Sequence, residues 1–199
     1  AICSGLVLAL QFGLGLERFG GKLYVPTILS LSFVRELGPV FTGLVIAGRV
    51  GAGYASEIGS MVVTQQVDAI RALGTSPISK IVVPRLLALA ICLPLLTVIT
   101  MFSGLWASLV LGDFQLNIDP GFYYARLVQS MQVRDVVLSM TKSFIFSFMI
   151  AIPACYYGLN VSSGTRGVGI ATTKAVVAGT VLIFISNFFI TKIFFMVVS

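Results

Sequence analysis

The chain has 199 residues, of which 57% are hydrophobic and only 10% are charged, and its formal net charge is +6. Soluble domains carry about 25% charged residues, so this chain has too few charges to cover a water-facing surface. We therefore predict an all-α integral membrane protein. The chain has no histidine, which excludes histidine-dependent metal sites and Ser-His-Asp catalysis.

The sequence also argues against cofactor binding and nucleic-acid binding. The cysteines, Cys3, Cys92 and Cys155, lie far apart in apolar runs without metal-ligand spacing, and the sequence has no Walker A motif. We therefore expect no metal, no cofactor and no ATP site in this chain. The basic residues are scattered between apolar runs, which is typical of membrane-flanking cations and not of a nucleic-acid surface.

Apolar segments predict about five transmembrane helices within a single transmembrane domain over residues 1–199. The first segment is short for a span and opens without the basic region of a signal peptide, so we expect an N-terminal segment to be missing. Asp119 and Pro120 predict the N-cap and first residue of a short amphipathic helix that reaches about Gln132. The basic residues divide equally between the two sides, so they do not orient the spans. The predicted spans are residues 1–16, 30–58, 82–112, 135–157 and 170–198.

Small residues form two neighbouring rows along the second predicted span, each with a spacing of four. Such rows let helix backbones approach closely within a membrane. The pattern predicts tight helix packing, either within the subunit or across a dimer. The first row is Ala47, Gly51, Ala55 and Gly59, and the second is Gly48, Ala52, Ser56 and Ser60.

Charged residues inside the predicted spans are candidates for function, because intramembrane charges usually face a cavity or a partner. Arg35 and Glu36 stand at the head of the second span, where they could contact substrate, form a gate or act as a structural pair. Lys142 lies inside the fourth span, seven residues after Asp135 and on the same helical face. It could contact a lipid phosphate, pair with Asp135 or extend to the membrane surface.

Residues 61–74 are polar and lie between the second and third predicted spans. Their apolar residues recur at helical spacing and predict a short amphipathic helix, which Gly74 ends. A helix that lies on lipid usually carries several basic residues, whereas this one has only Arg71, so a protein partner is the better fit. The apolar face consists of Val63, Val67, Ile70 and Leu73.

The segment Gly164-Thr-Arg-Gly-Val-Gly169 places glycines beside a basic residue. Phosphate-binding loops have a similar composition, but no strand precedes this segment and no Gly-Lys-Ser/Thr follows it. We therefore predict a tight loop before the fifth span.

Six short segments form a further pattern: Arg35-Glu-Leu-Gly-Pro39, Ala47-Gly-Arg-Val-Gly-Ala52, Glu57-Ile-Gly59, Thr64-Gln-Gln-Val-Asp-Ala69, Val83-Pro-Arg85 and Gly169-Ile-Ala-Thr-Thr-Lys-Ala-Val-Val177. Together and in this order, they resemble the MlaE-type permease family of ABC lipid transporters, and they span most of the chain. Two features depart from the family pattern. Position 65 is Gln where the family usually has Glu, and the family's N-terminal interfacial helix is absent from this chain.

The resemblance implies a permease homodimer bound to two cytoplasmic ABC ATPase subunits, which would bind ATP and Mg²⁺, so this chain itself is not expected to be an enzyme. It also implies a membrane-anchored Mce-domain lipid-binding protein on the other face, with a small STAS-type protein as an accessory subunit. The substrate would be a phospholipid or related lipid that moves between inner and outer membranes. The expected location is the bacterial inner (cytoplasmic) membrane or, alternatively, the plastid inner envelope.

The resemblance also assigns roles to individual residues. The lipid path is expected to include Arg35, Glu36, Lys142, Leu8 and Phe12. Residues 61–74 would be the coupling helix, which contacts the ATPase and places this segment and residues 158–169 in the cytoplasm. The expected coupling residues are Thr64, Gln65, Gln66, Asp68, Ala69, Arg71, Leu73 and Gly74. The expected helix-packing residues are Ala47, Gly48, Gly51, Ala52, Ala55 and Gly59.

Three alternative functions stay open at this stage. Residues 68–84 also resemble the cytoplasmic loop of ABC-importer permeases, so a permease for a non-lipid substrate is one alternative. A membrane-embedded enzyme of lipid metabolism is the second, although such enzymes usually have clustered acidic residues and the seven here are scattered. The third is a purely structural membrane subunit, which would leave the charged pair and the amphipathic helix unexplained.

Overall fold

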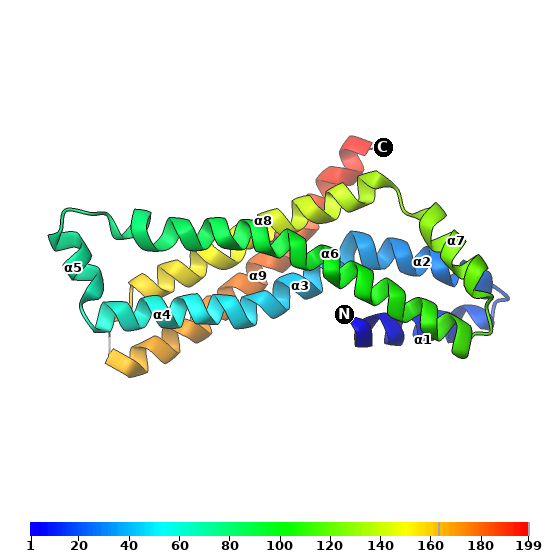
Figure 1. Ribbon diagram of the computed structural model, residues 1–199, viewed down its shortest axis with the longest axis horizontal. Coiled ribbons are helices and arrows are strands. Elements are labelled where there is room, and N and C mark those ends of the chain that lie inside the picture. The colour runs from blue at the N-terminus through cyan, green and yellow to red at the C-terminus, as the bar shows by residue number, and fades with distance from the viewer. Residues whose placement is uncertain (163, 199) are drawn as a thin grey trace. The chain divides into compact units, whose positions relative to one another are not determined.

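The computed structural model describes residues 1–162 and 164–198, and every regular element within them is helical (Figure 1). The predicted all-α membrane fold is therefore confirmed. Several of the helices follow one another directly through short 3₁₀ or π-helical turns. In chain order the helices are α1 (Ile2–Glu17), α2 (Val25–Ser32), α3 (Gly38–Ile46), α4 (Ala52–Val63), α5 (Gln66–Ala72), α6 (Val83–Phe114), α7 (Pro120–Ser130), α8 (Val133–Leu159) and α9 (Gly164–Val198).

Four helical segments of the described chain are long and apolar enough to cross a membrane. The first predicted span, α1, has 16 residues, which corresponds to roughly 24 Å at 1.5 Å per residue. A bilayer core is about 30 Å thick. The five predicted spans thus appear as four full-length segments and one shorter apolar helix. The four segments are Lys22–Val63, Ile78–Phe114, Val133–Leu159 and Gly164–Met196.

The second span begins earlier than predicted, at Lys22 instead of residue 30. Pro26 lies in the first turn of α2, where its missing N–H has no helical partner to lose, so the helix starts at the beginning of the apolar run. A π-helical turn, Phe33–Leu37, then leads into α3. Arg35 and Glu36 therefore lie within a continuous helical segment and not at its head.

The last span also begins earlier than predicted, because residues 164–169 belong to α9. The predicted tight loop is wrong at these positions. Gly164 has a φ of +49°, which glycine adopts without strain, and the helix follows at once. Val168 then packs on Gly59, where an added Cβ would lie 3.3 Å from the valine side chain. This tertiary contact outweighs the low helix propensity of the glycines.

The chain forms two compact units. The first contains residues 1–41 and 94–141, and the second contains residues 42–93 and the described part of 142–199. Helices α3, α6 and α8 contribute residues to both units. The prediction of a single domain over the whole chain stays a prediction.

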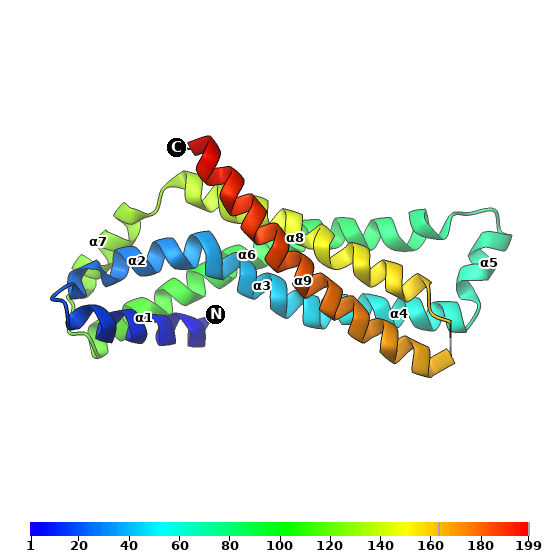
Figure 2. The same cartoon turned by 180° about the vertical axis from the view of Figure 1, so that it is seen from behind.

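In the first unit, α1, α2 and α7 lie beside the C-terminal part of α6 (Figures 1 and 2). Tyr123 of α7 is fully buried and fits against Gly112 of α6, where an added Cβ would come within 2.5 Å of the tyrosine ring. Asp119 caps α7 as predicted, because its carboxylate accepts a hydrogen bond from the N–H of Phe122 at 2.8 Å. Pro120 is the first residue of that helix. These contacts hold α7 against the end of a membrane span.

In the second unit, α4 packs against α8 and α9 through small side chains. Ala55, Ala154 and Ala175, one from each helix, form a buried cluster. A second cluster contains Ile58 of α4 and Val67 of α5. The short helix α5 is thus attached to the unit through its own apolar side chain.

Candidate functional site

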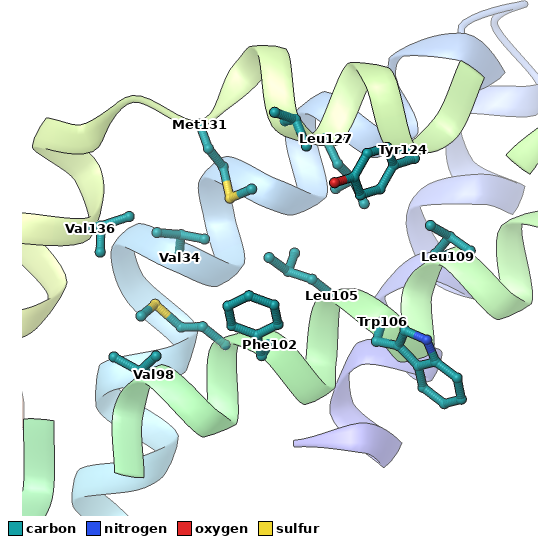
Figure 3. A pocket seen from close by; sticks show the side chains of 12 residues that line it. Val34, Val98, Phe102, Leu105, Trp106, Leu109, Tyr124, Leu127, Met131 and Val136 are labelled. Carbon is teal, nitrogen blue, oxygen red and sulfur yellow. The ribbon is translucent and has the colours of Figure 1, made fainter. Parts of the chain in front are cut away.

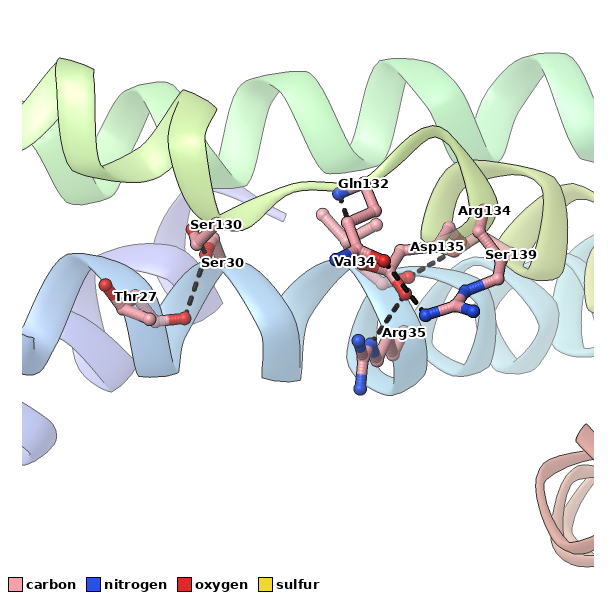
Figure 4. A network of polar contacts seen from close by, with 9 residues as sticks. All are labelled: Thr27, Ser30, Val34, Arg35, Ser130, Gln132, Arg134, Asp135 and Ser139. Atoms are coloured by element: carbon pink, nitrogen blue, oxygen red, sulfur yellow. Dashed lines mark hydrogen bonds and ion pairs between the residues drawn. The ribbon is translucent and has the colours of Figure 1, made fainter. Parts of the chain in front are cut away.

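An ion pair joins two helical segments of the first unit (Figure 4). Nε of Arg35 donates to Oδ1 of Asp135 at 2.8 Å. The Asp135 side chain is 1% exposed, whereas the Arg35 side chain is 26% exposed. Because a buried charge is costly without a partner, and charges inside membrane spans commonly mark functional paths, this pair is the centre of the candidate site.

Asp135 also organises the start of α8. Its Oδ2 accepts a hydrogen bond from the backbone N–H of Gln132 at 3.3 Å. The hydroxyl of Ser139 lies within hydrogen-bond reach of two carbonyl oxygens, those of Asp135 at 3.1 Å and Val34. Val34 precedes Arg35 in the π-helical turn, and such turns occur frequently at functional sites. The two segments are therefore joined through both side chains and backbone.

A second polar contact joins α2 to α7 nearby (Figure 4). The hydroxyl oxygens of Ser30 and Ser130 are 2.6 Å apart. One hydroxyl donates to the other, and each also lies 2.9 Å from a carbonyl oxygen of its own helix, Ser130 from that of Leu127 and Ser30 from that of Thr27. The helix that carries Arg35 is thus held at two levels, one of them directly against α7.

The contact between Arg35 and Asp135 was not predicted from the sequence. The sequence suggests Lys142 as a partner of Asp135, because their spacing places both on one helical face. The structure adds Arg35, which is 100 residues away in sequence and belongs to the facing helix. One feature of the sequence could have led to this pair: Asp135 is the only acidic residue of α8, so a basic residue on a facing helix is a natural partner. Lys142 is completely buried and belongs to the second unit, and its proposed role stays a prediction.

The other predicted path residues are partly buried in the first unit. Glu36 is half-buried in the π-helical turn. Leu8 and Phe12 of α1 are half-buried and pack on a cluster that contains Leu29 and Phe33. They therefore contribute to helix packing, and their contact with lipid stays a prediction.

The polar segment between the second and third spans folds as two helices and not as one. α4 continues to Val63 and α5 covers Gln66–Ala72, so the predicted single helix over residues 61–74 is wrong in its first turn. The break lies at Gln65, whose φ of +60° is in the left-handed region and cannot continue a right-handed helix. Gly74, with a φ of +74°, follows the end of α5 as predicted.

The α5 helix attaches to its unit through a narrow apolar face. Val67 is 3% exposed and packs with Ile58 and Ile81. Leu73 is 82% exposed, so the expected apolar face does not extend to this residue. The residues predicted to couple to a partner are all exposed: Thr64, Gln65, Gln66, Asp68, Ala69, Arg71, Leu73 and Gly74.

A polar cluster braces the helices on either side of α5. Nη2 of Arg85, at the start of α6, lies 2.9 Å from Oε2 of Glu57 on α4. The Arg85 guanidinium lies over the Tyr54 ring, 5.5 Å from its centroid, and the Tyr54 hydroxyl donates to the Arg85 carbonyl at 3.3 Å. Because α5 follows α4 and precedes α6, these contacts fix both ends of the segment that carries it. Glu57 and Arg85 both belong to the sequence motifs, but their pairing was not predicted.

The two rows of small residues have different environments in the second unit. A Cβ added to Gly51 would lie 3.2 Å from Cγ2 of Ile150 on α8, whereas one added to Gly48 would have no atom within 4 Å outside its own helix. The first row therefore packs inside the unit, while most of the second row is open. The buried residues are Ala47, Gly51, Ala55 and Gly59; in the second row, Gly48, Ser56 and Ser60 are exposed and Ala52 is half-buried.

Comparison with known proteins identifies the family. The family model described as Permease MlaE matches residues 1–193. The chain belongs to the MlaE permease family. The family resemblance predicted from the sequence motifs is thereby confirmed, and with its four full-length apolar helices this MlaE-family chain is a multi-pass membrane protein.

Relatives of this MlaE-family chain occur in bacteria and plants. A probable ABC transporter permease protein of Rickettsia typhi is 43% identical over 194 residues, which cover 98% of this chain and 75% of the relative. A probable ABC transporter permease protein of Synechocystis is 41% identical, with coverage of 96% and 73%. Protein TRIGALACTOSYLDIACYLGLYCEROL 1, chloroplastic, of Arabidopsis thaliana is 36% identical, with coverage of 96% and 55%.

Proposed function

We propose that this chain is the transmembrane subunit of an ABC transporter that moves phospholipids or related lipids between inner and outer membranes. ATP and Mg²⁺ would bind to a separate ATPase subunit. Membership of the MlaE permease family supports the permease role, and a relative named after trigalactosyldiacylglycerol supports a lipid substrate. The membrane would be the bacterial inner membrane or, as the chloroplastic relative suggests, the plastid inner envelope.

The observation that carries this proposal is the exposed face of α5 between two membrane spans. Asp68 and Arg71 form an ion pair at 3.1 Å with side chains 66% and 63% exposed, and the apolar Leu73 is exposed beside them. An apolar contact with a polar rim is typical of a protein interface, whereas a helix on the bilayer surface usually carries several basic residues. We therefore assign α5 as the coupling helix that contacts the ATPase.

This assignment orients the chain in the membrane. With α5 on the cytoplasmic side, α7 is on the opposite side, because one membrane-crossing helix, α6, separates them in the chain. The Mce-domain lipid-binding partner would then be on the side of α7. A small STAS-type protein is the proposed accessory subunit of the ATPase side.

The assembly would contain two copies of this chain and two ATPase subunits. The open row of small residues on the second span supports close contact between copies, because Gly48 and Ser56 are exposed and carry little side-chain bulk. The buried row would transmit motion within each copy. The transported lipid would lie in a cavity at the centre of the dimer, lined by the first two spans of each copy. Binding of ATP would draw the ATPases together, move both α5 helices and close this central cavity.

The lipid path is proposed to pass Arg35. A guanidinium presents five N–H donors in a plane and matches a phosphate well, and the Arg35 side chain is 26% exposed while its Nε binds Asp135. The ion pair fixes the orientation of Arg35, so less side-chain freedom is lost when a headgroup binds. Glu36 and Lys142 are the other polar residues proposed for the path, and Leu8 and Phe12 are proposed to contact the lipid tails.

Affinity purification of the tagged chain in mild detergent, followed by mass spectrometry, tests this proposal. We expect a stoichiometric P-loop ATPase together with an Mce-domain protein. An ATPase accompanied by a soluble solute-binding protein would favour the non-lipid importer, for which the importer-like residues 68–84 are the supporting observation. Recovery of the intact chain without any co-purified ATPase would contradict the assignment of α5 as the coupling helix.

A further inference from the structure

An apolar cavity of about 290 Å³ lies within the first unit (Figure 3). Its walls come from the π-helical turn after α2, from α6 and α7, and from Met131 and the first turn of α8. The residues that line it include Val34, Phe102, Trp106, Tyr124, Val128 and Met131. Neither Leu8 nor Phe12, which were predicted to meet lipid, lines this cavity.

The chemistry of the cavity excludes stable occupation by water. A buried water needs two to four polar partners, and among the side chains that line the cavity only Trp106 and Tyr124 carry a polar atom. An apolar cavity of about 150 Å³ in another protein stays dry and binds benzene. The present cavity is roughly twice that size, which suits a longer stretch of hydrocarbon.

The surroundings of the cavity identify the hydrocarbon. α6 belongs to a membrane-spanning segment, and two of its lining side chains, Phe102 and Trp106, are 76% and 66% exposed. The cavity therefore opens toward the surface of the span that faces lipid. Trp106 and Tyr124 suit a position near the headgroups, and the flexible Met131 can adjust to a chain of variable conformation.

We infer that this cavity binds one acyl chain of a bilayer phospholipid, which enters sideways from the membrane. This lipid site is separate from the proposed path at Arg35, and it goes beyond the proposed transport function because it requires only that the first unit is in a membrane. Val34 links the two regions: its side chain lines the cavity, and its carbonyl is within reach of Ser139 next to the ion pair. A bound acyl chain thus contacts Val34 and supports the π-helical turn that carries Arg35.

Site-specific photocrosslinking in the full-length protein, purified in detergent with whatever subunits accompany it, tests this inference. A photoreactive p-benzoylphenylalanine replaces Trp106, and a matched complex carries it at Ile99, which is 64% exposed on the same helix and outside the cavity. After extensive washing in detergent and irradiation, mass spectrometry measures phospholipid adducts. We expect several-fold more adduct at position 106, because detergent replaces lipid on an open surface more readily than in a cavity.

A cavity-filling variant provides the second test. Val128→Trp places a large side chain in the cavity from α7. The control, Val137→Trp, adds the same side chain at a residue that is 56% exposed and does not line the cavity. We expect only Val128→Trp to reduce the adduct at position 106, while thermal unfolding shows that both variants fold. Equal adducts at positions 99 and 106, an unchanged yield in Val128→Trp, or crosslinking to a protein instead of lipid would overturn the inference. A separate lipid-transport assay on these complexes tests the proposed function independently.

Discussion

The carboxylate of Asp135 lies 2.8 Å from Nε of Arg35 and joins two helical segments that are 100 residues apart in sequence. One partner is almost fully buried and the other is about one quarter exposed. The pair can therefore act in two ways: it locks α8 against the π-helical turn, and it leaves part of the Arg35 guanidinium accessible. Each of these roles can be tested separately.

Removal of Asp135 should destabilise the first unit. In Asp135→Ala, Arg35 loses a buried partner, and breaking a buried ion pair typically costs about 3–5 kcal/mol; partial exposure of Arg35 should place the loss near the lower end. Thermal unfolding in detergent would measure it. The control is Arg134→Ala, an exposed neighbour that donates to Gln132 at 2.9 Å, and surface changes of this kind usually stay within about 0.5 kcal/mol. Equal unfolding temperatures for the two variants would contradict a structural role for the pair.

The two rows of small residues should respond differently to the same substitution. Gly51→Leu should disrupt the fold and abolish transport, because its side chain would meet Ile150. Gly48→Leu should leave the fold intact, because nothing lies within 4 Å of its added Cβ outside its own helix, but it should weaken the proposed homodimer. Thermal unfolding and the mass of the complex in detergent would separate these effects. Normal transport by Gly51→Leu would refute close packing, and an unchanged dimer in Gly48→Leu would remove the second row from the interface.

Charge reversal on α5 should weaken ATPase binding without affecting the fold. The double variant Asp68→Arg with Arg71→Asp keeps the net charge, and exposed ion pairs contribute at most about 1 kcal/mol to stability. Co-purification of the ATPase would report the loss. The matched control reverses Glu17 and Lys22, an ion pair of the first unit at 3.4 Å. An intact and active complex with the α5 double variant would show that this face does not contact the ATPase.

The left-handed turn at Gln65 should set the direction of α5. Gln65→Gly should preserve the turn, because glycine adopts a positive φ without steric cost. Gln65→Val should disfavour it, because a β-branched side chain is more restricted at positive φ than the unbranched Gln side chain. Limited proteolysis between α4 and α5, followed in parallel with ATPase binding, would measure the difference. Equal protection in both variants would mean that the turn is held by other contacts.

The sequence predicts the parts of this molecule that depend on local chemistry. The cap at Asp119 and the end of the polar helix at Gly74 both follow from short patterns. The contact between Arg35 and Asp135 does not, because the sequence shows two charges but not which helix faces which. Tertiary packing also determines the helix through residues 164–169, where a local reading of the glycines predicts a loop.

Reconstitution into liposomes tests the central claim most directly. The chain, with its co-purified ATPase and Mce-domain partner, would be supplied with a fluorescent phospholipid, and transfer to acceptor vesicles would be followed with and without ATP. We predict ATP-dependent lipid transfer that is strongly reduced when Arg35→Ala is introduced into an otherwise intact complex. ATP hydrolysis without any lipid transfer by the wild-type complex would contradict the proposal that this chain forms a lipid path.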